Sequence, residues 1–198
     1  SGESHLLLTL LEPAEGVVPD RDHDRVARVG GVAAALRTAR ARGAADHWSM
    51  PATVGEPFLE WLPSWDPPST TSVVGADRMI RTRTDAAFLR WRYGFEPLHY
   101  RAVRSGDGAV VVRLRRRGPA TELVVAASFG IDDVDRVVAP ALREVGADHA
   151  IRLGRADVRR GWFGLPGGGP LLTWRGANHV GMPPAPNWSL SMGDVELF

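Results

Sequence analysis

The sequence predicts an α/β fold of the α+β type, in which helices cover both faces of a mixed, mostly antiparallel sheet. Ser105-Gly106-Asp107-Gly108 separates two expected strands, 99–105 and 109–117, and is a strong hairpin signal. Residues 122–129 are almost continuously apolar, as in a central strand that is covered on both faces. An apolar helical stripe over 134–145 and a strand over 149–153 follow.

Composition and charge exclude several classes of function. The chain has 198 residues, of which 44% are hydrophobic and 24% charged, as in a soluble globular protein. No apolar stretch reaches the roughly 18 residues that a membrane-spanning helix needs. The net charge of +1 gives no long-range attraction to nucleic acid or to an anionic membrane. We therefore expect a cytoplasmic protein that binds neither.

Two residue types are absent from the sequence. Without cysteine there can be no disulfide, thiolate nucleophile or cysteine-based metal site, and we expect no metal. All 24 basic residues are arginines, so lysine Schiff-base chemistry and a Walker-type phosphate lysine are excluded too.

The first part of the chain, residues 1–81, differs from the rest and is interpreted as the tail of a preceding lobe plus a linker. Residues 5–11 could form a strand, and the spacing of apolar residues predicts a helix over 25–42. The proline-rich run 51–71 is expected to be a connector that wraps over a surface, with Trp61 and Trp65 packed on a neighbouring lobe.

The second part, residues 82–198, has a regular pattern. Thr82-x-x-Asp85 is a loose capping box before a helix that ends at Gly94. In strand 109–117 the alternation predicts one apolar buried face and one solvated face, which carries Arg113, Arg115 and Arg117. Pro140 should kink the helix that follows strand 122–129 or mark a new start within it. Two last strands are expected over 171–174 and 188–192.

Two local signatures in this part resemble the C-terminal lobe of bacterial two-lobed acyltransferases of the GNAT superfamily. One is Thr84-x-x-x-Phe88-Leu89-Arg90-Trp91-Arg92-Tyr93, followed by Pro97-x-x-Tyr100. The other is the ending Trp188-Ser-Leu-Ser-Met-Gly193-Asp194-Val-Glu196-Leu-Phe. The resemblance covers residues 82–198 and implies the GNAT fold, whose element order it shares. It also implies transfer of an acyl group from acetyl-CoA or another acyl-CoA to a small-molecule or peptide amine, and it leaves a homodimer open.

The cofactor loop of that superfamily is altered in this sequence. Relatives bind the CoA pyrophosphate through backbone N–H groups at the turn after the central strand, in a (Gln/Arg)-x-x-Gly-x-(Gly/Ala) motif. Here the turn holds Gly130 but also Asp132, Asp133 and Asp135, whose charges would repel a pyrophosphate. Most of the CoA site is then expected on a lobe outside this chain.

Two other segments could bind phosphate. Arg28-x-x-Gly31-x-Ala33 fits the motif, although an ordinary linker helix explains it as well. The glycine-rich stretch 161–169 is followed by strand residues, so a flexible turn is favoured over a phosphate loop.

The remaining candidate site residues come from the signatures and the strand beside them. Arg92 could grip an anionic substrate, and Trp91 could line the cleft or dock its helix on the sheet. Tyr100 could protonate the leaving thiolate, and His99 or Glu196 could take the amine proton. Asp194 and Glu196 would share a strand face. They could divide acid and base roles, one could pair with an arginine such as Arg92, or the segment could be a C-terminal anchor. The alternative function is a catalytically silent GNAT-like module for binding or dimerisation.

Overall fold

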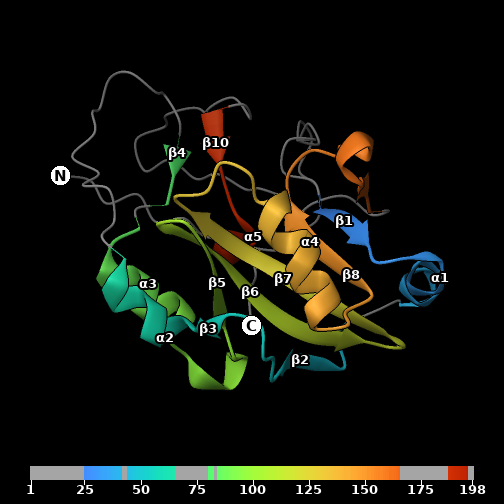
Figure 1. The fold of residues 1–198 in the computed structure, drawn as a ribbon, viewed down its shortest axis with the longest axis horizontal. Coiled ribbons are helices and arrows are strands. Elements are labelled where there is room, and N and C mark those ends of the chain that lie inside the picture. The colour runs from blue at the N-terminus through green and yellow to red at the C-terminus, as the bar shows by residue number, and fades with distance from the viewer. Residues whose placement is uncertain (1–24, 42–43, 66–79, 83, 166–186, 196–198) are drawn as a thin grey trace, which may run out of the picture.

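A computed structural model describes residues 25–41, 44–65, 80–82, 84–165 and 187–195 (Figure 1). Eight strands form one sheet in the order β3-β5-β6-β7-β8-β1-β9, with β2 paired to β6, and β10 and β4 form a second, two-stranded sheet. The strands are β1 (Arg25–Val29), β2 (His47–Met50), β3 (Glu56–Pro57), β4 (Ile80–Arg81), β5 (Arg101–Ser105), β6 (Gly108–Arg117), β7 (Ala120–Phe129), β8 (His149–Leu153), β9 (Trp162–Gly164) and β10 (Trp188–Ser189). The helices are α1 (Val32–Arg40), α2 (Phe58–Trp61), α3 (Ala86–Tyr93), α4 (Asp135–Glu144) and α5 (Met192–Val195), with short 3₁₀ turns η2 (Leu62–Ser64), η3 (Glu96–Leu98) and η4 (Val158–Arg160).

The main sheet is antiparallel except between its central strands β7 and β8. These two run parallel because α4 connects them and returns the chain across one face of the sheet (Figure 1). Their pairing covers only Glu122–Val124 against His149–Ile151. Strand β7 then continues to Phe129, and no other described strand pairs with it on that edge. The two central strands therefore stop pairing halfway along β7.

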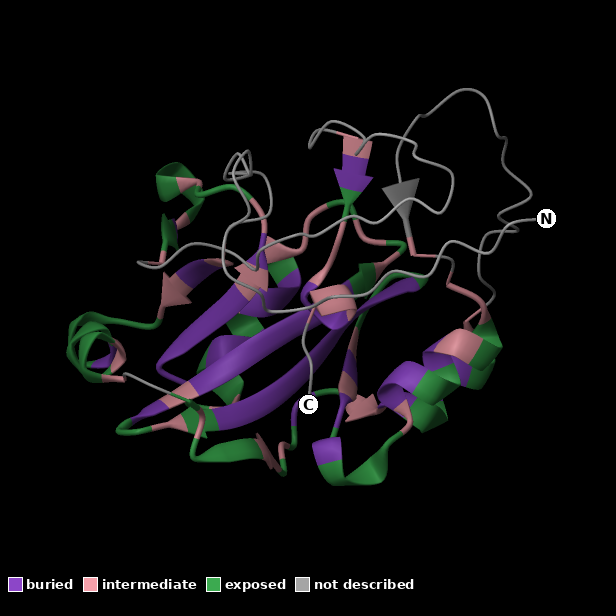
Figure 2. Ribbon diagram, turned by 180° about the vertical axis from the view of Figure 1, so that it is seen from behind, coloured by how far each residue is buried: buried purple, intermediate pink, exposed green. Residues whose placement is uncertain are grey.

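Helices lie on both faces of the sheet. The apolar side of α4 (Val137, Val138, Ala141 and Leu142) forms one buried cluster with Leu114, Leu123 and Val125 of the sheet. On the other face, α2 and α3 cover β5, β6 and the end of β7, and Met192 of α5 packs on Val124 and Ile151. Burial on both faces makes the central strands the core of the molecule (Figure 2). The structure thus confirms an α+β fold with a mixed, mostly antiparallel sheet.

Several expected elements are confirmed at close to their predicted bounds. The hairpin β5–β6 turns at Gly106 with a φ of 59°, a backbone conformation that glycine adopts without strain. Strands β7 and β8 and helices α3 and α4 also form, and α4 contains Pro140. Trp61 is buried, and Trp65 stacks on it with ring centroids 5.5 Å apart, as the sequence predicted for the proline-rich run.

The helix expected over residues 25–42 is wrong in its first part. Residues 25–29 form strand β1, which lies between β8 and β9, and α1 starts only at Val32. Gly30 and Gly31 break the helix because the backbone at Gly31 has a φ of 157°. The outward side of α1 carries Val32 and Leu36, which are 84% and 58% exposed. The apolar spacing therefore predicted the helix itself, and packing decided where it begins.

The solvated face expected on strand 109–117 is also wrong. Arg113 and Arg115 are buried, and Arg117 is half-buried, because this face of β6 points into the protein interior. The guanidinium of Arg113 lies 5.3 Å from the ring centre of Tyr100. Arg115 instead pairs with Glu122 of β7. The sequence alternation located the arginines correctly, but their burial depends on partners from other strands.

The C-terminal strand expected over 188–192 is shorter than predicted. Strand β10 has two residues and pairs with β4, and the chain then turns into α5. Asp194 consequently lies on a short helix and not on a strand, whereas Glu196 and the expected strands 5–11 and 171–174 lie outside the described residues.

Strands from both sides of the expected boundary at residue 81 share the main sheet, since β1, β2 and β3 pair with β8, β6 and β5. The division into residues 1–81 and 82–198 stays a prediction. None of the helices in the described ranges is long and apolar enough to cross a membrane.

Candidate functional site

The two signature segments meet beside strand β7. Arg92 of α3 is buried, and its Nε donates a hydrogen bond of 2.6 Å to the carbonyl oxygen of Gly193 in α5. A Cβ atom at position 193 would overlap the hydroxyl of Tyr93 and come within 3.2 Å of the Ala126 carbonyl oxygen. Glycine is therefore the residue that lets α5 lie this close to both α3 and β7.

Asp194 fixes the same junction from the other side. Its Oδ1 accepts a hydrogen bond of 2.5 Å from the hydroxyl of Thr82. Its Oδ2 accepts bonds of 2.7 Å from both the backbone N–H and the hydroxyl of Ser191. Thr82 does not cap α3; the N-cap is Asp85, which accepts from the N–H of Phe88 at 2.8 Å. The capping box is therefore wrong in its first residue, because Thr82 is used to hold the C-terminal segment.

The aromatic rings at the junction are enclosed. Tyr93 and Tyr100 lie edge to face, with centroids 5.0 Å apart, and both are buried. Burial, and after it the negative charge of Asp194, raises the pKa of Tyr93 far above its ordinary value. Tyr93 is thus a neutral hydrogen-bonding group here. Tyr100 also lies near the guanidinium of Arg113.

His99 stands apart from Tyr100, at the surface. It adopts a left-handed backbone conformation, with a φ of 48°, at the end of η3. Its Nδ1 lies 3.2 Å from the hydroxyl oxygen of Ser49, whose single proton is donated to the Leu98 carbonyl oxygen at 2.5 Å. The contact therefore requires that Nδ1 carry a proton, which leaves Nε2 as the basic nitrogen of the neutral ring.

Trp91 lies on the outer side of α3 and does not dock the helix on the sheet, so that alternative is wrong. It is 70% exposed and contacts Phe88 at a centroid distance of 5.6 Å. The inward residues of this helix are Leu89, Arg92 and Tyr93. Trp91 and Arg92 thus point to different surroundings, although they are neighbours in the sequence.

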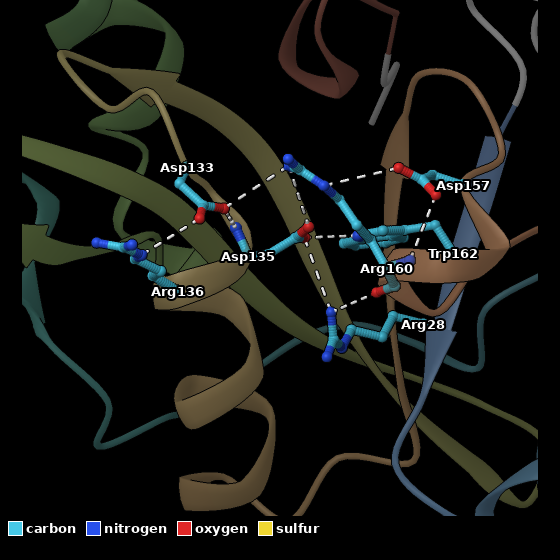
Figure 3. Close-up of polar contacts among 7 residues, drawn as sticks. All are labelled: Arg28, Asp133, Asp135, Arg136, Asp157, Arg160 and Trp162. Carbon is cyan, nitrogen blue, oxygen red and sulfur yellow. Dashed lines mark hydrogen bonds and ion pairs between the residues drawn. The ribbon is translucent and has the colours of Figure 1, made fainter.

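The turn between β7 and α4 is braced by charges (Figure 3). Gly130 has a φ of 62°, which favours glycine. Asp133 lies 3.3 Å from Nε of Arg136 and 3.9 Å from Arg160. Asp135 accepts a hydrogen bond of 2.6 Å from the indole Nε1 of Trp162, and two guanidinium groups lie 3.8 Å from its carboxylate. The carboxylates at this helix N-terminus are therefore held by the chain's own side chains.

Of the candidate phosphate segment Arg28-x-x-Gly31-x-Ala33, Arg28 lies at the acidic turn and Gly31 lies at the start of α1. Arg28 of β1 reaches this turn: it is one of the two arginines beside Asp135, and it donates a hydrogen bond of 2.7 Å to the carbonyl oxygen of Arg160 (Figure 3). Gly31 caps the start of α1, and a Cβ there would meet nothing within 4 Å. Arg28 thus belongs to the braced turn and is committed to carboxylate and carbonyl partners.

A second polar cluster was missed from the sequence. Glu122 of β7 and His149 of β8 are paired in register and are both buried. Glu122 bonds to Arg115, to Nε of Arg117 at 2.9 Å and to Nε2 of His149 at 3.2 Å. The signal was available, because Glu122 is the charged residue inside an otherwise apolar strand. Such a residue needs buried partners.

The chain matches no known protein-family model, no curated protein and no solved structure. Among the residues that the structure describes, no group of three or more histidine, aspartate or glutamate side chains is placed to hold a metal ion.

Proposed function

We propose that this chain forms the C-terminal lobe of a two-lobed N-acyltransferase, which transfers an acyl group from acyl-CoA to a small-molecule or peptide amine. The observation that carries the proposal is the contact between Arg92 and Gly193. The two segments that resemble the GNAT superfamily are far apart in the sequence, and they form one packed unit against β7. Their pairing is what a shared structural role would produce.

The arrangement of the central strands adds support. A hairpin, a long central strand, a helix and a parallel strand follow one another, as the resemblance implies. Because β7 and β8 separate after Val124, one edge of β7 is left without a described strand partner over its last five residues. Backbone groups at such an edge can pair with an extended ligand that carries amides.

Acyl-CoA would be held mainly outside this lobe. The N-terminus of α4 is occupied by Asp133 and Asp135, and the arginines beside them are already paired with these carboxylates. A pyrophosphate would have to displace these contacts and would meet the carboxylate charges. The lobe would then supply acceptor contacts and a proton acceptor.

Among the candidate acid–base residues that the structure describes, His99 is the exposed one, and we assign it the role of proton acceptor. Its imidazole is exposed, and the Ser49 contact leaves Nε2 basic. In the reaction the amine would attack the thioester carbonyl, a backbone N–H would stabilise the oxyanion, and Nε2 would take the amine proton. The exposed Trp91 would offer an aromatic surface to the acceptor.

Thermal stability with acetyl-CoA tests the division of labour between lobes. Ligand binding raises the melting temperature by mass action. If the chain is one lobe of a two-lobed protein, we expect a shift for the two-lobed protein and none for the chain alone. A shift for the chain alone would place the CoA site here and contradict the division, and no shift for either would contradict the enzyme itself.

A variant pair tests His99 directly. His99→Gln should lower turnover of an amine acceptor by at least about tenfold without changing the melting temperature, since general-base catalysis typically contributes 10²–10⁴-fold. His47→Gln, an exposed histidine on β2, is the matched control and should leave turnover unchanged. Equal activity of the two variants would remove His99 from the mechanism.

The second candidate function is a catalytically silent module for binding or dimerisation. The braced turn at Asp133 and Asp135 favours it, because the position where GNAT-superfamily proteins hold the cofactor carries an internal ion-pair network in this chain. This function predicts no response to acetyl-CoA, either from the chain or from a two-lobed protein that includes it.

A further inference from the structure

A chain of three polar side chains connects α1 to the sheet. Thr38 of α1 places its hydroxyl oxygen 3.0 Å from Nδ1 of His149, and Nε2 of the same ring lies 3.2 Å from a carboxylate oxygen of Glu122. The imidazole and the carboxylate are buried, and the hydroxyl belongs to a half-buried residue on a helix whose other residues are mostly exposed. The relay therefore runs from the interior toward the surface.

The charge state of Glu122 determines the direction of the two hydrogen bonds in this relay of Thr38, His149 and Glu122. Burial by itself would raise the pKa of Glu122, but the hydrogen bond from His149 and the charges of Arg115 and Arg117 outweigh it and hold the pKa well below its ordinary value. An ionised carboxylate can only accept hydrogen bonds. When the ring is neutral, Nε2 therefore donates to Glu122, and Nδ1 is the acceptor.

The hydroxyl of Thr38 must then donate its proton to Nδ1. This is the arrangement that activates a hydroxyl nucleophile: a base accepts the hydrogen bond of the hydroxyl and can take its proton, and a carboxylate orients the base. The sequence showed no serine, histidine and aspartate pattern because the three residues come from a helix and two different strands. It is the register pair between Glu122 and His149 that aligns them.

A purely structural role does not require this bond. The preceding residue, Arg37, already fastens α1 to the sheet through two contacts with Asp148, at 2.6 Å from Nε and 2.5 Å from a terminal nitrogen. Asp148 is itself held by the N–H of Thr121 at 2.9 Å.

We propose that Thr38 is the nucleophile of a second site, which accepts an acyl group from an activated ester or thioester. The Thr38 oxygen attacks the carbonyl carbon, and its proton passes to Nδ1 of His149. Collapse of the tetrahedral oxyanion breaks the bond to the alkoxide or thiolate leaving group, which takes the proton from His149. Water then attacks the threonyl ester and gives its proton to His149, which releases the carboxylic acid and restores the Thr38 hydroxyl. The inference does not depend on the proposed function.

The test uses the full chain and p-nitrophenyl acetate as the probe. We expect release of p-nitrophenolate and, after a rapid quench, a peptide that carries one acetyl group on Thr38. Thr38→Val keeps the shape of the side chain without the hydroxyl and should lower the release at least tenfold, whereas Thr38→Ser should retain it. Ser105→Ala, at the β5–β6 turn, is the control for background acylation and should react like the wild type.

A second variant separates catalysis from folding. His149→Gln supplies an amide that can donate to Glu122 and accept from Thr38, so the contacts are kept while the base is removed. We expect this variant to retain a cooperative thermal transition and to lose acylation of Thr38. Release by Thr38→Val at the wild-type rate, or acetylation of another residue in its place, would overturn the proposal. An unreactive wild-type protein would do so too.

Discussion

The Nε atom of Arg92 bonds to the carbonyl oxygen of Gly193, 101 residues further along the chain, at 2.6 Å. The bond joins α3 to α5 in the interior, where β7 separates from β8. Met192, next to Gly193, packs on Val124 and Ile151, one residue from each of the two strands. The C-terminal segment therefore covers one face of the sheet at the place where the two central strands stop pairing.

The first prediction concerns the space at Gly193. Gly193→Ala would press a methyl group into the Tyr93 hydroxyl, and overpacking of this kind costs about 1–3 kcal/mol. We expect a lower free energy of unfolding, measured by urea denaturation. Removing the hydroxyl with Tyr93→Phe should recover part of the loss in the double variant.

The matched control is Gly164→Ala. Gly164 lies in β9, and a Cβ there would meet nothing within 4 Å, so its stability should change by less than about 0.5 kcal/mol. If Gly193→Ala were as stable as the control, α5 would not be packed tightly against α3 at this position.

The second prediction concerns the buried charge at Glu122. Glu122→Gln leaves Arg115 buried without its carboxylate partner, and breaking a buried pair in this way costs about 3–5 kcal/mol. The free energy of unfolding, again from urea denaturation near neutral pH, should fall by that order. Glu56→Gln, which breaks the partly exposed pair with Arg104, is the control and should cost less than about 1 kcal/mol.

The stability of the same variant should also depend on pH in a direction that can be checked. Because the pKa of Glu122 is depressed in the folded state, its stabilising contribution is present above the unfolded pKa, about 4.3 for glutamate, and is lost as the pH falls below it. The stability difference between wild type and Glu122→Gln should be constant above about pH 5 and should shrink below about pH 4. A difference that stayed constant into strong acid would contradict an ionised Glu122.

The sheet could be predicted because several of its strands carry short-range sequence signals. The hairpin depends on Ser105-Gly106-Asp107-Gly108, and the central strand depends on the apolar run after Glu122, both of which are short-range patterns. Strand β1 could not be recognised in the same way. It is short, it carries two arginines, and its place between β8 and β9 is decided by residues 120 or more positions away.

The polar sites could be predicted only where one segment contains the whole motif. The acidic turn at Asp133 and Asp135 was visible, but the arginine that reaches it from β1 and the indole of Trp162 were not. The relay of Thr38, His149 and Glu122 was missed altogether, since no spacing in the sequence brings its three members together. Arg113 and Arg115 were likewise predicted to be solvated and are buried. A charge pattern along one strand does not show which residues of other strands will contact it.

The last prediction concerns the ionisation of Tyr93. The chain contains only two tyrosines, Tyr93 and Tyr100, so Tyr100→Phe leaves one phenol to titrate. Burial raises the pKa of Tyr93, and we expect tyrosinate absorbance in this variant to stay low through the ordinary midpoint of about 10. It should appear only as the protein unfolds, because the unfolded chain binds its phenolic proton less tightly than the folded one.

The sign of the stability change follows from the same linkage. A raised pKa means that the folded state keeps a proton that the unfolded state loses, so stability should be constant below about pH 10 and should fall as the pH rises above it. Tyr93→Phe is the control and should lack this alkaline decline, apart from what the arginines and Tyr100 contribute. A tyrosinate signal with a midpoint near 10 in folded Tyr100→Phe, verified by circular dichroism at each pH, would mean that solvent reaches the Tyr93 hydroxyl. The junction between α3 and α5 would then be open on that side.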